Sequence, residues 1–269
     1  MPITNLNTPF QGIPAQDYFV SRSRDFVPMG SGYIIPSVQE DLFPERPLQF
    51  YIHIDAQPSA RCELLGALLA RVTQMREHLP PLKARVYANV PANAQELLFF
   101  YKHNGFDPTD SMDEYSYPLL STQVPQAPVG CEFASVPLAS VQEQQRFLQR
   151  LNQYRLTPIT HDYLAIQMQQ PYFMALGYYR GGQPVAELLV SGARPEAAAL
   201  VMVYVRPEAR NRGIGKALTQ SAGALLSQNG VRKMVAQVYA SVTPQVRLIR
   251  SLGGERNKIV AFFPSIEIG

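Results

Sequence analysis

The sequence predicts an α/β protein with mixed sheets, built as two domains of which the first is truncated. Short apolar segments typical of strands alternate with segments of helical spacing along the chain. A polar, proline-containing stretch at 121–130 indicates a linker, which gives expected domains at 1–125 and 126–269. The order of elements in the first part repeats part of the order in the second, as a duplication would.

The composition is that of a folded chain with a sizeable core. Hydrophobic residues make up 46% of the 269 residues and charged residues 17%, which argues against wholesale disorder. No apolar run approaches the ~18 residues that a bilayer span requires, and the first residues do not resemble a signal peptide. Cys62 and Cys131 lack the spacing of a metal site or a disulfide framework. We therefore expect a cytoplasmic protein without a metal site or membrane contact.

Charge is unevenly distributed along the chain. Residues 1–130 carry nine Lys/Arg against thirteen Asp/Glu, a net of −4, and residues 131–269 carry fifteen against eight, a net of +7. A basic half suits a polyanionic ligand. A nucleic-acid surface is disfavoured, because the basic residues lack interleaved aromatics or a known reader motif.

The second domain begins with a strand, two helices and a meander of three strands. The strand is expected at 131–137, and the helix at 140–154 has a capping box formed by Ser140 and Glu143. A second short helix is expected over 160–169. The three strands, separated by turns, are predicted at 172–179, 184–192 and 198–205. The last is apolar on both faces, which indicates a central position.

Two more helix–strand pairs complete the second domain. A helix with apolar residues at Ile214, Leu218, Ala222 and Leu225 follows the basic loop and stops at Asn229-Gly230. The remaining elements are a strand at 231–240, a helix at 243–254 and a strand at 258–263.

The first domain shows a shorter version of the same order. It has strands at 48–55 and 83–90, a loop with a helical tail at 56–72, a helix at 93–106 and an extended run at 113–119. VYANV (86–90) mirrors VYASV (238–242), and Arg61 mirrors Arg212. Duplication is the simplest account, and a coincidence of common patterns is the alternative.

The loop VRPEARNRGIGKAL (205–218) concentrates basic residues and glycines between a strand and a helix. The first turn of a helix leaves backbone N–H groups without partners, and its dipole adds partial positive charge. Glycines at 213 and 215 let a pyrophosphate approach these N–H groups. Arg210, Arg212 and Lys216 supply counter-charge, so the loop predicts an anion site; the alternative is a solvated basic turn.

The run Arg210-Asn211-Arg212-Gly213-Ile214-Gly215 resembles the Arg/Gln-x-x-Gly-x-Gly/Ala signature of the GNAT superfamily of acyltransferases, and so does the order of elements over about 130–265. A dinucleotide fingerprint and a Walker A loop both fail on spacing. The resemblance implies acetyl-CoA (coenzyme A) as cosubstrate. The implied cofactor-binding residues are Val203, Tyr204, Val205, Arg210, Asn211, Arg212, Gly213, Ile214, Gly215 and Lys216.

The corresponding stretch of the first domain is Ser59-Ala60-Arg61-Cys62-Glu63-Leu64. Side chains at Cys62 and Leu64 and the charge of Glu63 are incompatible with a pyrophosphate. The first domain is therefore expected to be a degenerate GNAT-like domain with a structural or substrate-shaping role.

The resemblance also implies a direct attack of a neutral amine on the thioester. Backbone N–H groups at Met202 to Tyr204 would polarise its carbonyl. The tyrosine that commonly protonates the leaving thiolate is replaced by Ile249, whereas the first domain keeps Tyr101 at its equivalent position. Tyr239 is the candidate substitute for the general acid; a packed or surface tyrosine is the alternative.

The general base has no obvious position on the central strand. Glu187 is the best carboxylate candidate, with an exposed strand residue as the alternative, and His161-Asp162 lies in the expected acceptor wall at 155–174. That wall holds one acid among apolar and aromatic residues, which favours a small, partly apolar amine.

These observations lead to one hypothesis and two alternatives. The hypothesis is an acetyl-CoA-dependent N-acetyltransferase of tandem GNAT form, acting on the amine of a small molecule without a nucleic-acid partner. The alternatives are a non-catalytic acyl-CoA-binding or regulatory module and a purely structural pair of domains. The sequence does not predict the acceptor, the acyl chain or the oligomeric state.

Overall fold

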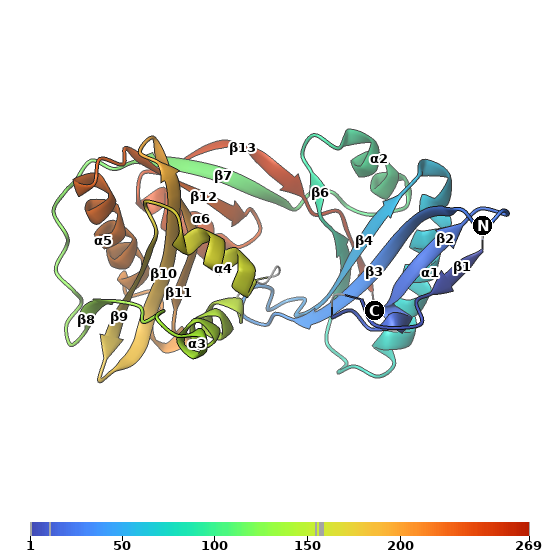
Figure 1. The fold of residues 1–269 in the computed structure, drawn as a ribbon, viewed down its shortest axis with the longest axis horizontal. Coiled ribbons are helices and arrows are strands. Elements are labelled where there is room, and N and C mark those ends of the chain that lie inside the picture. Colours follow the sequence, from blue (N-terminus) through green and yellow to red (C-terminus); the bar gives the residue numbers. More distant parts are fainter. Residues whose placement is uncertain (1, 11, 154, 156–158, 269) are drawn as a thin grey trace. The chain divides into compact units, whose positions relative to one another are not determined.

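The computed structural model describes residues 2–10, 12–153, 155 and 159–268, and it divides into two compact units (Figure 1). Unit 1 comprises the residues up to Ser111 and those from Ala261 onward, and unit 2 comprises Met112–Val260. The mixed α/β fold with two units confirms the predicted fold class.

Unit 1 contains a six-stranded sheet in the order β1-β2-β3-β4-β5-β14. Its strands are β1 (Ile3–Asn5), β2 (Tyr18–Arg22), β3 (Pro28–Val38), β4 (Leu48–Ala56), β5 (Ala84–Ala88) and β14 (Ser265–Ile268), and the short helix η1 (Ala15–Asp17) precedes β2. Strands β4 and β5 run parallel, and every other neighbouring pair is antiparallel. The sequence did not predict β1 to β3.

Two helices complete unit 1. Helix α1 (Pro58–Arg76) supplies the crossover that the parallel pair β4–β5 requires. It buries Leu64, Leu68 and Val72, which recur at helical spacing, against the sheet. Helix α2 (Gln95–His103) contributes Tyr101, whose side chain is buried in the same core.

A second sheet runs in the order β6-β13-β7-β12-β11-β10-β9-β8 and forms the centre of unit 2. Its strands are β7 (Ser111–Pro118), β8 (Glu132–Ser135), β9 (Met174–Arg180), β10 (Gln183–Arg194), β11 (Ala197–Val205), β12 (Lys233–Tyr239) and β13 (Glu255–Phe262). The short β6 (Val90–Pro91) and the last two residues of β13 belong to unit 1. Strands β9 to β11 form the antiparallel meander that the sequence predicts, and the separately predicted strand β8 pairs antiparallel with β9.

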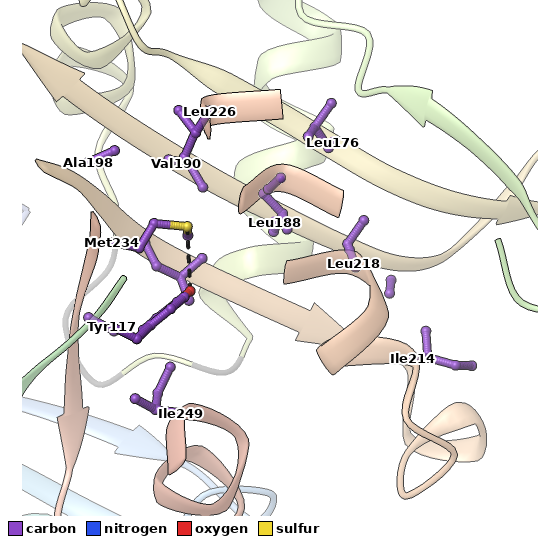
Figure 2. Close-up of a cluster of buried hydrophobic side chains, with 14 of the residues drawn as sticks. Tyr117, Leu176, Leu188, Val190, Ala198, Ile214, Leu218, Leu226, Met234 and Ile249 are labelled. Carbon is purple, nitrogen blue, oxygen red and sulfur yellow. Dashed lines mark hydrogen bonds between the residues drawn. The ribbon is translucent and has the colours of Figure 1, made fainter. Parts of the chain in front are cut away.

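Helices cover both faces of the unit 2 sheet (Figure 1). Helices α5 (Ile214–Gln228) and α6 (Thr243–Ser251) pack on one face, where Leu218 and Ile249 join Leu188 and Met234 in one buried cluster (Figure 2). Helices α3 (Val141–Asn152) and α4 (His161–Met168) pack on the other face. This three-layer arrangement explains why β11 is apolar on both faces.

The helix signals of the second domain are reproduced closely. Ser140 and Glu143 form the predicted capping box of α3. Thr160 caps α4 by accepting a hydrogen bond from the backbone N–H of Tyr163. Residues 154 and 156–158, which the prediction placed at the end of the first helix and in the acceptor wall, lie outside the described residues.

In each unit, one strand of the sheet comes from a part of the sequence that is distant from its partner strand. Strand β7 precedes the linker but pairs antiparallel with β12 in unit 2. Strand β14 lies at the end of the chain but pairs antiparallel with β5 in unit 1. The expected domains at 1–125 and 126–269 stay a prediction, and the compact units of the structure are bounded at 111/112 and 260/261.

We call this arrangement of β7 and β14 the strand exchange. Because of it, the end of the chain forms part of the unit 1 sheet. We expect a chain truncated after Pro264 to lose hydrogen-exchange protection at the β5 amides, because β5 loses its partner strand and Ile266 and Ile268 no longer cover the core. Protection of β12 in unit 2 should not change. The full-length Glu267→Gln variant, altered at an exposed site in β14, is the control. Unchanged β5 protection in the truncated chain would contradict the exchange.

Candidate active site

The central feature of unit 2 is the divergence of its two parallel strands. Among the described residues, pairing between β11 and β12 is confined to Ala198–Leu200 and Met234–Ala236, although both strands continue beyond these residues. The register between β10 and β11 shifts at the same point, so that Val201 is an extra residue, as in a β-bulge. Bulges bend a strand and increase its twist, which accounts for the separation.

A cavity of about 280 Å³ lies where the strands diverge. Its walls include Val201 to Val203 of β11 and Gln237 to Tyr239 of β12. Leu248 and Ile249 of α6 line it as well. Arg155 and Tyr163 line the same cavity and come from the segment around α4.

The basic loop connects the end of β11 to α5. Pro207–Ala209 forms a short 3-10 helix, η2, and Asn211 and Gly213 follow with positive φ of 60° and 75°. Gly213 is the N-cap of α5 and has no side chain to cap it, in contrast to Ser140 and Thr160 at α3 and α4. The N-cap therefore supplies no side-chain acceptor to the N–H groups of the first turn of α5.

The two loop glycines have different roles in the structure. A Cβ added to Gly213 would meet no atom within 4 Å, so this residue keeps the approach to the helix end open. A Cβ at Gly215 would lie 3.2 Å from Cγ2 of Val205, so this glycine permits close packing of α5 on β11. Ile214 between them is buried in the core. Gly213, rather than Gly215, is thus the residue with open space around it.

The basic side chains surround this helix end in different ways. Arg210 donates from Nε to the carbonyl oxygen of Val205 at 3.1 Å, which ties the loop to the end of β11. Arg212 is exposed and Lys216 is half-buried. Arg206 forms an exposed ion pair with Glu208 at 3.6 Å. The loop therefore presents positive charge around the bare N-terminus of α5.

The predicted residues of β11 point to both faces of the sheet. Val203 and Val205 pack toward the α5 side, and Val203 also lines the cavity. Tyr204 is buried on the α3 side. Tyr204 and Val205 pair with Glu187 and Ala186 of β10, so their backbone is fixed on one edge.

The two candidate catalytic residues have different surroundings. Tyr239 lines the cavity, as expected of a group that protonates the leaving thiolate. Ile249 lines it too, so the position at which the family has a tyrosine faces the cavity with an aliphatic side chain.

Glu187 is fully buried and does not line the cavity among the described residues. Arg150 of α3 donates to both of its carboxylate oxygens at 2.7 Å, and the Tyr179 hydroxyl donates to Oε1 at 3.1 Å. The bond to Glu187 raises the pKa of Arg150, and burial raises the pKa of Tyr179. A carboxylate held in this way is not placed to take a proton from an amine, so we assign Glu187 to anchoring α3 on β10 instead of the predicted base role.

The other polar candidate, His161-Asp162, lies in the first turn of α4 and is exposed. Neither residue lines the cavity among the described residues, whereas the neighbouring Tyr163 does. Among the described residues, no group of His, Cys, Asp or Glu is arranged to hold a metal ion.

Among its described residues, unit 1 has no counterpart of the basic loop. Helix α1 begins at Pro58, two residues after β4 ends, so the predicted equivalent stretch 59–64 is helical. Arg61 donates from Nε to the carbonyl oxygen of Ala56 and pairs with Glu96 at 2.7 Å. Tyr101 is buried in the core of unit 1.

Sequence reasoning missed three residues that shape unit 2. Arg150 and Tyr179 bind Glu187, and Arg155 lines the cavity. Arg150 lies in the last turn of a predicted helix, and Arg155 begins the predicted acceptor wall. No motif indicated the partners of either residue, because those partners lie on strands distant in the sequence.

Comparison with known proteins agrees with this geometry. Residues 141–253 match the acetyltransferase (GNAT) family. The chain also resembles a solved GCN5-related N-acetyltransferase from Sphaerobacter thermophilus, with 19% identity, a TM-score of 0.51 and coverage of 96% of this chain and 82% of that one. At that identity the likeness shows the fold alone. Among the described residues, no helix is long and apolar enough to cross a membrane.

Two relatives are both named mycothiol acetyltransferase. The protein of Arthrobacter sp. (strain FB24) is 31% identical over 107 residues, which cover 36% of this chain and 33% of the relative. The protein of Pseudarthrobacter chlorophenolicus is 26% identical over 220 residues, which cover 76% of this chain and 67% of the relative. The chain thus matches a third of the first relative's length and about two thirds of the second's.

The assignment of Glu187 can be tested by protein stability. We expect Arg150→Met to lower the free energy of unfolding of unit 2 by about 3–5 kcal/mol, because it leaves a buried carboxylate without its cation. Glu187→Gln should cost less, about 1–3 kcal/mol. The control is Lys258→Met in the exposed pair with Glu114, expected to cost under about 1 kcal/mol.

Denaturant unfolding monitored within unit 2 checks this expectation. Normal stability of Arg150→Met would contradict the anchoring role. Loss of catalysis in Glu187→Gln at unchanged stability would restore Glu187 as a candidate base.

Proposed function

We propose that the protein transfers an acetyl group from acetyl-CoA to the amine of a small molecule. The observation that carries the proposal is the location of two features at the end of β11. The cavity opens on this strand beyond Leu200, and the strand then leads directly into the basic loop and the uncapped N-terminus of α5. A ligand with a diphosphate at one end and a thioester at the other matches both features.

The residues of the basic loop fit the diphosphate of acetyl-CoA. The open space at Gly213 lets phosphate oxygens reach the N–H groups of the first turn of α5, and an anion is favoured there by the helix dipole. Asn211, Arg212 and Lys216 lie within three residues of Gly213 in the sequence, and Arg210 fixes the loop to β11. Charge-assisted hydrogen bonds of this kind each contribute about 1.5–3 kcal/mol.

The cavity fits the thioester end of acetyl-CoA. Acetyl-CoA supplies an activated acyl group, and the backbone of Met202 to Tyr204 is the proposed source of N–H groups for the thioester carbonyl. The extended arm of the cosubstrate would lie along β11 where that strand no longer pairs with β12. The mostly apolar lining favours a neutral amine, the form that acts as a nucleophile.

Tyr239 is the proposed proton donor to the leaving thiolate. It lines the cavity, whereas the usual family position is Ile249. A thiol has a pKa of about 8.5 and leaves tolerably as a thiolate near neutrality. General acid help is therefore worth at most ~10²–10⁴-fold, and the reaction remains accessible without a tyrosine at 249.

A second candidate is a non-catalytic acyl-CoA-binding or regulatory module. Two observations favour it: Ile249 replaces the tyrosine, and the described residues that line the cavity include no carboxylate. Turnover distinguishes the two functions, because both require acetyl-CoA to bind. Binding without acetylation of any amine in a broad panel would support the module.

The role of the loop is tested by a pair of glycine variants. We expect Gly213→Leu to weaken CoA binding about 10–100-fold in calorimetry, because a side chain enters the space of the diphosphate. The matched control is Gly230→Leu at the other end of α5, which has a similar φ of 81° and open space around its Cβ. Both variants carry similar backbone strain, and only Gly213 lies in the loop. Equal CoA affinity in the two variants would contradict the proposed site.

The role of Tyr239 is tested by removing its hydroxyl. We expect Tyr239→Phe to lower kcat by about 10²-fold at unchanged CoA affinity, because thiolate departure loses its proton donor. The control is Tyr117→Phe, which removes the hydroxyl that bonds Sδ of Met234 on a neighbouring strand and should leave kcat unchanged. A wild-type rate in Tyr239→Phe would remove Tyr239 from the mechanism.

A further inference from the structure

Gln245 is a polar side chain in the wall of the cavity between β11 and β12. It lies in the first turn of α6 and lines the cavity together with Tyr239, the last residue of β12. Its Oε1 accepts a hydrogen bond from the backbone N–H of Tyr239 at 3.1 Å. This bond ties the start of α6 to the end of β12.

The bond to Tyr239 decides which way the amide of Gln245 faces. A backbone N–H can only donate, so the oxygen of the amide faces it and the nitrogen points elsewhere. Within the described part of the chain, Nε2 of Gln245 has no hydrogen-bond partner, and the side chain is half-buried. Its two N–H groups are therefore available to a ligand at the cavity wall.

An extended arm that lies in the gap between β11 and β12 has two edges. The pantetheine arm of CoA contains two amide groups, and a trans amide directs its N–H and its C=O to opposite sides. If one edge of the arm bonds β11 in the manner of an added strand, the other edge faces β12 and α6. A carbonyl on this second edge needs a donor from that wall, because a desolvated carbonyl without one is unfavourable.

Side-chain donors are few on the wall formed by β12 and α6. Among the described residues that line the cavity from these two elements, Gln237 and Gln245 are the ones whose side chains carry N–H groups. The others are aliphatic, apart from Tyr239 with its hydroxyl. Gln237 is exposed, whereas Gln245 is half-buried and held by its bond to β12. A donor that is already held in place loses less conformational entropy when it binds a ligand.

We propose that Gln245 donates a hydrogen bond from Nε2 to an amide carbonyl of the pantetheine arm and so fixes how far the arm enters the cavity. The proposal rests on the proposed function, because it takes CoA as the ligand and the gap between β11 and β12 as the path of its arm. The group that Gln245 recognises is a secondary amide in an extended chain, and the nucleotide part of CoA is not involved.

Two substitutions separate this role from the bond to Tyr239. Gln245→Glu keeps an oxygen acceptor for the Tyr239 N–H but removes both side-chain donors, and Gln245→Met removes donors and acceptor alike. We expect each variant to bind CoA about tenfold more weakly than the wild type in calorimetry, because each loses the donor. Denaturant unfolding should show lower stability of unit 2 in Gln245→Met alone, because only this variant leaves the backbone N–H without its acceptor.

The reference ligand is ADP, which carries a diphosphate without the pantetheine arm. Its affinity should be the same in both variants as in the wild type. The control variant is Gln126→Glu, the same change at an exposed glutamine of the linker that does not line the cavity among the described residues. This variant should leave the affinities for CoA and ADP unchanged.

The outcomes separate the two proposals. Wild-type CoA affinity in Gln245→Glu, or an equal loss of affinity for CoA and ADP in both variants, would overturn the role of Gln245 while CoA binding itself stands. If CoA affinity depends on Gln245 as expected but no amine is acetylated, the arm site stands and the transferase function fails. Failure of CoA to bind the wild-type chain at millimolar concentration would overturn both.

Discussion

The separation of two neighbouring parallel strands is the constraint on which unit 2 depends. In the part of the chain that the structure describes, β11 and β12 pair over Ala198–Leu200 and Met234–Ala236, and the extra residue Val201 occurs where this pairing stops. Breaking a sheet in its centre costs backbone hydrogen bonds, which a buried sheet ordinarily retains. Strand β10 still holds one edge of β11, and the edges of β11 and β12 that no longer pair line the cavity.

The two units share the order strand, helix and parallel strand, but only unit 2 has a long loop between the strand and the helix among the described residues. Both place a helix after a central strand that runs parallel to the next one. In unit 2 eight residues separate the strand from the helix, and they carry the arginines and Gly213. In unit 1 a single residue, Gln57, separates β4 from α1. The second unit can present a helix end to an anion, and the first uses the same region for packing.

Much of unit 2 could be predicted from sequence because its signals are local. The capping box at Ser140, the apolar β11 and the glycine at 213 each act within a few residues. Pairings between distant segments could not be predicted. The exchange of β7 and β14, the bond between Arg150 and Glu187, and the position of Arg155 each join residues that no periodicity connects. Glu187 illustrates the difference, since its sequence context indicated a carboxylate near the site but not the arginine that binds it.

The most direct measurement of the central claim is a crystal structure of the full chain soaked with acetyl-CoA. The account predicts density for the diphosphate against the N–H groups that follow Gly213, and for the thioester between Val203 and Tyr239. Density for the cosubstrate elsewhere on the chain, or a helix end that remains empty at saturating ligand, would contradict it.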